Sequence, residues 1–196
     1  LIGGSFFERL KPGAIFCNAG RGEVVETEAL ERAIDSGRLG GVILDVWENE
    51  PRIGAEILRK TDIGTPHIAG YAFDGKALGT YMVYRAACEF LGAAPDWDWK
   101  AAMPAPQPAE ITVDARGKRE EQALREAVER AYPIERDDRA LRATARMAPD
   151  ERGAEFDRLR KQYLLRREFD AAPLRVDGAS PALAAAFAGL GFRIIG

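Results

Sequence analysis

The sequence predicts an α/β protein with a parallel sheet, followed by a smaller second α/β unit. Two runs of strand length, AIFCN (14–18) and GVILDV (41–46), are largely apolar, which is typical of parallel strands buried on both faces. Between them, TEALERAIDSG (27–37) has the apolar spacing of an amphipathic helix and ends at a glycine. Strand, helix and strand joined by short connections indicate a parallel sheet.

The remaining residues of the first domain fit the same arrangement. The predicted elements are a short helix over 4–10, ended by a Lys-Pro-Gly turn, an extended stretch over 63–68, and a long helix over 74–91. Pro66 requires an extended residue before it, which supports the third strand.

A proline-rich segment divides the chain. Residues 93–108 contain Pro95, Pro104, Pro106 and Pro108, a composition typical of an extended linker. Beyond it, the pattern predicts strands at 108–115, 174–176 and 192–195, and helices at 120–132, 150–169 and 181–191. The predicted domains are therefore residues 1–95 and 109–196, with the linker at 96–108.

Composition argues against several classes of protein. The net charge of −3 gives no overall attraction to nucleic acid or to an anionic membrane. No apolar run approaches the ~20 residues that span a bilayer. Cys17 and Cys88 are far apart and lack the spacing of metal ligands, so we expect no metal and a reduced, cytoplasmic setting. Cys17 lies within a predicted strand, where we expect it to be buried as a small apolar residue.

Polar residues accompany each of the three predicted strands of the first domain. Arg21 follows the first strand, Asp45 and Glu50 lie at and after the end of the second, and His67, the one histidine, lies in the third. Because the carboxyl ends of parallel strands meet at one edge, we expect these side chains to face one crevice. Arginine suits a substrate carboxylate, and histidine can exchange a proton near neutral pH. Pattern alone thus predicts an α/β protein with a candidate acid–base site.

Three motifs carry a resemblance to a known family. FCNAGRGEVV, GGVILDVWENEP and GTPHIAGY, in this order and spacing, are similar to the last three signature blocks of the NAD-dependent D-2-hydroxyacid dehydrogenases. The resemblance covers residues 1 to about 92. It implies part of a Rossmann-like nucleotide-binding domain, NAD as the cofactor, and oxidation of a small 2-hydroxy acid.

The resemblance also implies a role for each site residue. Arg21 would bind the substrate carboxylate, His67 would take the C2 hydroxyl proton, and Glu50 would orient His67 and support its charged form. Asp45 would hold the nicotinamide carboxamide. Further implied contacts are with the cofactor, from Ala19, Gly20, Arg21 and Gly70, and with the substrate, from Tyr71.

NAGRGEVV, LDVWENEP and HIAGYAFDGKALGT, together with the further domain after the linker, most resemble a family member that acts on a phosphorylated hydroxy acid. That resemblance, in which residues 109–196 match by position, implies a homodimer formed through these residues. The 196 residues contain no GxGxxG turn, which the family carries upstream, so we expect a carboxyl-terminal half that does not turn over alone. Two alternatives are another D-2-hydroxyacid dehydrogenase, of the glyoxylate, hydroxypyruvate or phosphoglycerate type, and a non-catalytic dehydrogenase-like module that senses nucleotide and assembles partners.

Overall fold

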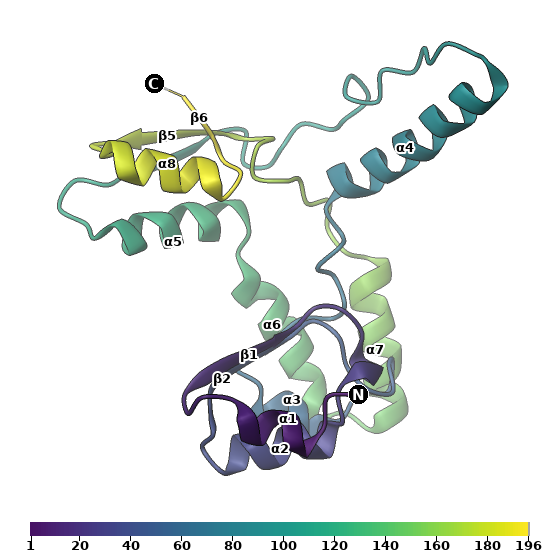
Figure 1. The fold of residues 1–196 in the computed structure, drawn as a ribbon, viewed down its shortest axis with the longest axis vertical. Coiled ribbons are helices and arrows are strands. Elements are labelled where there is room, and N and C mark those ends of the chain that lie inside the picture. The colour runs from purple at the N-terminus through teal and green to yellow at the C-terminus, as the bar shows by residue number, and fades with distance from the viewer. Residues whose placement is uncertain (196) are drawn as a thin grey trace. The chain divides into compact units, whose positions relative to one another are not determined.

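The computed structural model describes residues 1–195, which form two compact units (Figure 1). The first unit joins residues 1–69 to residues 134–163, and the second joins residues 70–133 to residues 164–195. This division differs from the domain boundaries predicted from the sequence, because residues 134–163 pack with the amino-terminal residues. Each unit has a sheet and a buried core of its own.

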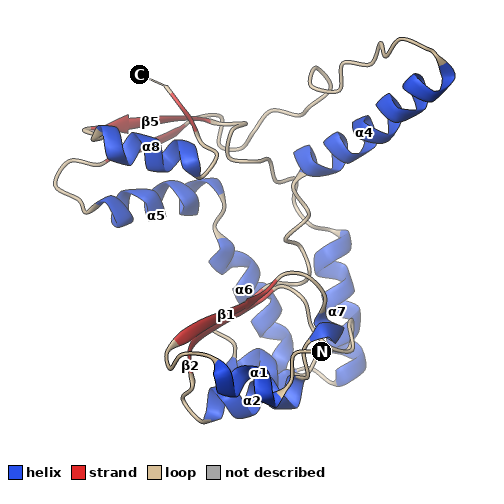
Figure 2. Ribbon diagram, viewed as in Figure 1, coloured by secondary structure: helices blue, strands red, loops and turns tan. Residues whose placement is uncertain are grey.

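The first unit contains a parallel sheet with the strand order β1–β2–β3, of which Figure 2 labels β1 and β2. Its strands are β1 (Ala14–Asn18), β2 (Leu39–Leu44) and β3 (Ile63–Gly64). The predicted parallel α/β fold is confirmed. The second strand covers 39–44 rather than 41–46, and the third is shorter than the predicted stretch over 63–68.

Short helices cover one side of the β1–β2 pair (Figure 1). They are α1 (Gly4–Arg9) and α2 (Thr27–Asp35), followed along the chain by α3 (Ala55–Lys60), which the sequence pattern did not indicate. The apolar stripe of α2 is buried, through Ala29, Leu30 and Ala33. These side chains form one cluster with Phe16 and Val42 of the sheet.

The other face of β1 is exposed. Ile15 is 71% exposed, and Cys17 is exposed as well. The expectation that Cys17 is buried was therefore wrong. Successive strand side chains point to opposite faces of a sheet, and the described residues cover the face of β1 that carries Phe16.

Residues 134–163 complete the core of the first unit. They form α6 (Ile134–Ala143), a 3₁₀ turn η2 (Thr144–Arg146) and α7 (Pro149–Lys161). Leu141 and Phe156 are fully buried in the same apolar cluster as Leu58. α6 was not predicted, and α7 ends at Lys161 instead of continuing to residue 169 as predicted.

The second unit contains a further parallel sheet, with the order β4–β5–β6. Its elements are β4 (Ile111–Asp114), α5 (Glu120–Ala131), β5 (Pro173–Asp177), α8 (Pro181–Gly189) and β6 (Arg193–Ile194). Leu174 of the sheet and Phe187 of α8 lie in one buried cluster. The predicted small second α/β unit is thus present.

The long helix α4 (Phe73–Leu91) also belongs to the second unit. Asp74 in its first turn accepts hydrogen bonds from the Arg167 guanidinium and from Glu168 N, at 2.9 Å each. Burial by itself raises the pKa of the Asp74 carboxyl, but the bonds from Arg167 and Glu168 outweigh it and hold that pKa below its usual value. The start of α4 is thereby fastened to the segment that precedes β5.

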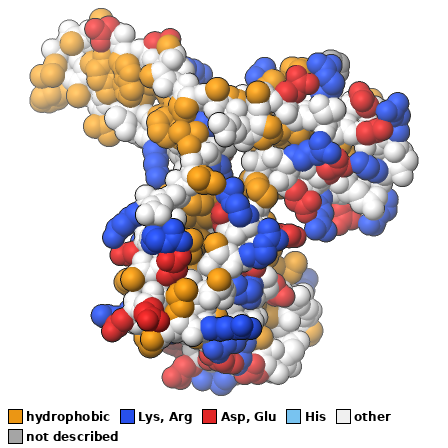
Figure 3. All heavy atoms as spheres, turned by 180° about the vertical axis from the view of Figure 1, so that it is seen from behind, with side chains coloured by type: hydrophobic (Ala, Val, Ile, Leu, Met, Phe, Trp, Pro, Cys, Tyr) orange, Lys and Arg blue, Asp and Glu red, His pale blue; other side chains and the backbone are white. Residues whose placement is uncertain are grey.

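Apolar side chains gather on α4, at the upper left of Figure 3. The large exposed ones are Phe73, Leu78, Met82, Val83, Phe90 and Leu91. Elsewhere in this view Lys and Arg lie among Asp and Glu. α4 is 19 residues long but carries charged side chains, and no helix in the described part of the chain combines the length and apolar character needed to cross a membrane.

Candidate functional site

The carboxyl ends of β1, β2 and β3 form one edge of the first sheet. Backbone hydrogen bonds continue past these ends: Asp45 N donates to Asn18 O at 2.9 Å, and His67 N donates to Asp45 O at 2.7 Å. Asn18, Asp45 and His67 therefore follow one another across the edge in strand order. The parallel register places the loops that carry the candidate residues beside each other.

His67 and Glu50 form a hydrogen-bonded pair at this edge. His67 Nδ1 lies 2.7 Å from Glu50 Oε2, and the two side chains are 26% and 15% exposed. The other Glu50 oxygen accepts from Trp47 N at 2.9 Å, so the carboxylate is held in place. Because an ionised carboxylate can only accept, the proton of a neutral ring lies on Nδ1. His67 Nε2 is then the nitrogen that can take a proton.

Asp45 holds the loop that carries His67. Its carboxylate is 6% exposed. Oδ1 accepts from Thr65 Oγ1 at 2.6 Å and from Ile68 N at 2.7 Å, and Oδ2 accepts from Ala69 N at 2.9 Å. His67 has φ 55°, in the left-handed region, which costs a non-glycine residue about 1–3 kcal/mol unless its surroundings impose it. Asp45 supplies such contacts on both sides of His67.

The same edge can accommodate the nicotinamide end of a cofactor. A carboxylate offers about four acceptor positions, and the loop uses two on Asp45 Oδ1 and one on Oδ2. Oδ2 can therefore accept one more hydrogen bond, which fits the implied contact with a carboxamide. Ala19 and Gly20 are exposed, and a Cβ added at Gly20 would meet just Asn18 Oδ1, at 3.6 Å, so a ligand can approach this backbone closely.

The loop after β1 is held by Asn18, which was not singled out from the sequence. Asn18 Nδ2 donates to Arg21 O at 2.9 Å, and Asn18 Oδ1 accepts from Gly20 N at 3.1 Å. Arg21 is exposed, and its guanidinium donates to Gly20 O at 2.8 Å. The structure thus brings Arg21 to the same edge, while among the described residues no hydrogen bond joins its side chain to His67 or Glu50.

Gly22, in the 3₁₀ turn η1 (Gly22–Val24), is required by packing. A Cβ at this position would lie 2.0 Å from Trp47 O. Trp47 is 2% exposed, and its Nε1 donates to Thr65 O at 2.9 Å. The glycine therefore lets the Arg21 loop lie directly on the backbone that leads to Glu50.

Gly70 and Tyr71 belong to the second unit. The Tyr71 ring lies 3.7 Å from Lys76 Nζ, a cation–π contact within that unit. Their contacts with cofactor and substrate remain predictions. Within residues 1–195, no group of three or more His, Cys, Asp or Glu side chains is arranged to hold a metal ion.

Two residues that organise the site, Asn18 and Thr65, were missed in the sequence. Asn18 ends the strand predicted over 14–18 and directly precedes the Ala-Gly-Arg loop, whereas Thr65 lies within the stretch predicted over 63–68. That position was the available signal, because a side chain there can bond the loop that follows. Nothing in the sequence showed which backbone groups they would bind.

Two family models match this chain. Residues 1–69 match the family model described as the NAD-binding domain of D-isomer specific 2-hydroxyacid dehydrogenases. This segment is therefore similar to the NAD-binding domain of that family. The family resemblance based on three motifs is confirmed. Residues 103–191 match a second family model, described as a domain of unknown function.

Several curated relatives carry one name. Erythronate-4-phosphate dehydrogenase from Marinobacter nauticus is 39% identical over 194 residues, which is 99% of this chain and 50% of that relative. The protein of the same name from Escherichia coli O139:H28 is 43% identical over 173 residues, 88% of this chain and 44% of that relative. The chain thus spans about half the length of the curated relatives it matches.

A solved structure is similar over a smaller part. The 2-hydroxyacid dehydrogenase from Ketogulonicigenium vulgare Y25 is 30% identical, with a TM-score of 0.40. The match covers 48% of this chain and 30% of that chain.

Proposed function

We propose that the chain takes part in the NAD-dependent oxidation of 4-phospho-D-erythronate to 2-oxo-3-hydroxy-4-phosphobutanoate, in pyridoxal 5′-phosphate (vitamin B6) biosynthesis. The observation that carries the proposal is the His67–Glu50 pair, 2.7 Å apart at the sheet edge of a dehydrogenase segment. The names of the two relatives, at 39% and 43% identity, support the substrate. Because the chain spans about half of each relative, the activity is assigned to a longer protein with this chain as its carboxyl-terminal half.

In the proposed reaction, His67 Nε2 takes the proton of the C2 hydroxyl. Glu50 keeps the ring proton on Nδ1 and faces the charge that the ring gains. Arg21 binds the substrate carboxylate through its planar guanidinium, and Asp45 Oδ2 accepts from the nicotinamide amide. Bound NAD supplies the hydride acceptor. The same proposal places Ala19, Gly20 and Gly70 along the cofactor and Tyr71 against the substrate.

The proposal includes a homodimer formed through residues 109–196 and a cytoplasmic location. The position of this region after the dehydrogenase segment supports the dimer, and two-fold association is the commonest assembly of such proteins. Light scattering over a range of concentrations tests it. A mass of twice the 21.5 kDa of this chain is expected, and a constant 21.5 kDa would count against the dimer.

The enzymatic test uses the longer protein, with the upstream half that the relatives possess. We expect NADH to form from 4-phospho-D-erythronate, and His67→Ala to lower kcat on the order of 10²- to 10⁴-fold. Glu28→Ala, whose side chain is 91% exposed on α2, is the control and should retain the parent rate. A parent-like rate for His67→Ala would refute the acid–base role.

Two further measurements test the substrate and the need for a longer protein. Rates are measured with a panel of substrates. A higher rate with substrates of the glyoxylate, hydroxypyruvate or phosphoglycerate type than with 4-phospho-D-erythronate would show that the proposed substrate is wrong. The 196-residue chain by itself is expected to form no NADH, because its sequence has no GxGxxG turn to bind the pyrophosphate.

A further inference from the structure

Residues 134–163 contact both parts of the chain that carry the His67–Glu50 pair. This segment, α6 to α7, falls inside the region matched by the domain of unknown function, and the sequence pattern placed it in the second domain, 109–196. In the structure it belongs to the first unit. One contact comes from α6 and reaches the strand before His67; the other comes from α7 and reaches the loop after Glu50.

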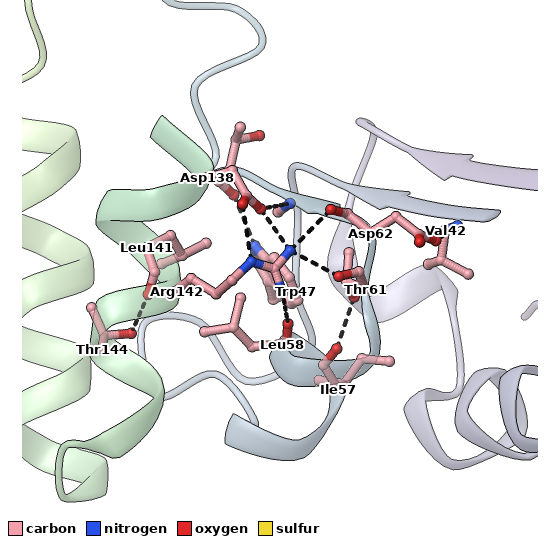
Figure 4. Close-up of polar contacts among 12 residues, drawn as sticks. Val42, Trp47, Ile57, Leu58, Thr61, Asp62, Asp138, Leu141, Arg142 and Thr144 are labelled. Atoms are coloured by element: carbon pink, nitrogen blue, oxygen red, sulfur yellow. Dashed lines mark hydrogen bonds and ion pairs between the residues drawn. The ribbon is translucent and has the colours of Figure 1, made fainter. Parts of the chain in front are cut away.

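α6 holds β3 through Asp138. Asp138 Oδ1 accepts from Gly64 N at 2.7 Å, in the strand that leads to His67, and its side chain is 16% exposed. Arg142 donates to both Asp138 oxygens, at 2.7 and 2.9 Å, and so fixes the carboxylate (Figure 4). β3 is the last strand of its sheet. Asp138 therefore gives the Gly64 amide the acceptor that a further strand would otherwise supply.

Arg142 also binds the turn that leads into β3. Its guanidinium donates to Leu58 O at 3.0 Å, to Thr61 O at 2.8 Å and to Asp62 O at 3.0 Å. The last carbonyls of a helix have no partner within the helix, and Arg142 satisfies such groups at the end of α3. Figure 4 shows the guanidinium between Asp138 and these carbonyls. α6 thus holds the backbone from the end of α3 to β3, the strand that leads to His67.

α7 supports the loop of Glu50 at Gly153. A Cβ at Gly153 would lie 3.3 Å from Arg52 Cγ and 3.5 Å from Pro51 O, so the helix backbone lies directly on this loop. Asp150 accepts from Arg52 Nε at 2.8 Å beside it. Pro51 follows Glu50 directly in the chain. The contact with α7 therefore supports the backbone that carries the Glu50 side chain.

The segment is firmly anchored in the first unit. Leu141, Thr144 and Phe156 are fully buried, and Leu141 and Phe156 belong to the apolar cluster of that unit. Catalytic geometry is best kept by side chains whose supporting elements are locked by packing. Residues 134–163 meet that condition for both members of the pair.

We propose that residues 134–163 position the His67–Glu50 pair, with Asp138 acting on His67 through β3 and Gly153 acting on Glu50 through Pro51. This gives a role to part of the domain of unknown function. The kinetic consequence rests on the proposed function. The geometric consequence does not, because loss of either contact alters the pair whether or not it catalyses.

The one histidine of the chain makes the geometric test direct. In ¹⁵N-labelled protein, His67 gives the one set of imidazole nitrogen signals, which report the tautomer and the hydrogen bond at Nδ1. Asp138→Ala removes the acceptor for Gly64 N, and we expect the ring to change from a fixed Nδ1–H form to a mixture of both tautomers. Arg139→Ala, on the same helix with a side chain 71% exposed, is the control and should leave the ring signals in place.

Gly153→Ala tests the α7 contact in the same way. Alanine favours a helix more than glycine does, so the helix is retained while the added methyl group crowds the Arg52 side chain and comes into van der Waals contact with Pro51 O. We expect the His67 ring signals to shift. Gly79→Ala in α4, where an added Cβ meets nothing within 4 Å, is the matched control.

Two results would overturn the geometric claim. One is parent-like His67 ring signals in both Asp138→Ala and Gly153→Ala; the other is a shift of equal size in the two controls. If the backbone spectrum shows that Asp138→Ala does not fold, Gly153→Ala and its control decide.

Kinetics in the longer protein separate this proposal from the proposed function. Asp138→Ala and Gly153→Ala are expected to lower kcat about 10-fold, since a displacement of ~1 Å can cost up to ~10²-fold, with KM for NAD little changed. Shifted ring signals with a parent-like kcat would overturn the kinetic claim. A parent-like rate in His67→Ala would instead overturn the proposed function and leave the geometric claim standing.

Discussion

Phe156 gives a quantitative test of where residues 134–163 belong. Its side chain is 0% exposed and lies in the cluster that contains Leu58 and Trp47. Replacing a fully buried Phe by Ala costs about 3–5 kcal/mol, a large share of the ~5–15 kcal/mol that stabilises a domain. With a urea dependence of about 2 kcal/mol per M, a loss of ~4 kcal/mol lowers the unfolding midpoint by about 2 M.

Phe187 is the matched control in the second unit. It is also 0% exposed, and it lies in a separate cluster with Leu174. Because the two units have separate cores, we expect each to unfold in its own transition. Phe156→Ala should lower the midpoint of the first unit, and Phe187→Ala that of the second.

A urea titration followed by NMR distinguishes the two transitions. The Trp47 indole N–H and the His67 ring report the first unit, and the Leu174 methyl groups report the second. The reasoning would be refuted if Phe156→Ala left the first midpoint in place and lowered the second.

Three more substitutions test individual contacts. Glu50→Ala should convert the neutral His67 ring from the Nδ1–H to mainly the Nε2–H form, seen in imidazole nitrogen shifts at alkaline pH; a retained Nδ1–H form would contradict the hydrogen bond. Asp74 has a lowered pKa in the fold, so its stabilising effect is complete above the unfolded pKa of ~3.9 and is lost as pH falls through the folded pKa. Asp74→Asn should therefore flatten the acid dependence of the second unit's urea midpoint, and an unchanged slope would count against the ion pair. Asn18→Ala removes two hydrogen bonds of loop 19–21, each worth ~1 kcal/mol. It should raise KM for the acid substrate roughly 10-fold, with a smaller effect on kcat. A parent-like KM would exclude a role of Asn18 in holding the Arg21 loop.

The first sheet could be predicted because its signals are local. The run at 14–18 has the same limits as β1, and the helix predicted from residue 27 begins there as α2. Strand length, apolar content and helical spacing are all read within a dozen residues. The exposure of Cys17 could not be read in this way, because it depends on what lies over that face of the sheet.

α6 could not be predicted for a related reason. Its sequence, IERDDRALRA, is mostly charged and contains few apolar residues. The helix depends on distant partners: Leu141 enters the core of the first unit, and Arg142 binds carbonyls at the end of α3. Isolated helices of this length are marginal in water, and packing supplies most of their stability.

The location of the candidate site residues could be predicted from strand order, whereas their hydrogen-bond partners could not. Arg21, Asp45 and His67 could be placed at one edge because parallel strands end together. That Asp45 binds the His67 loop on both sides, and that Asn18 binds the Arg21 loop, depends on backbone groups whose directions are set by the folded loops.

These contacts change how the two parts of the chain should be separated in experiments. Cutting after residue 100 follows the sequence-based boundary, but it removes Leu141 and Phe156 from the core of the first unit and Asp138 from β3. An amino-terminal piece cut there lacks residues that bury its apolar cluster and hold its His67 strand. Loss of assembly in such a piece would therefore not distinguish a lost interface from a lost fold. Surface substitutions within 164–195 leave the first unit's core intact and therefore test association alone.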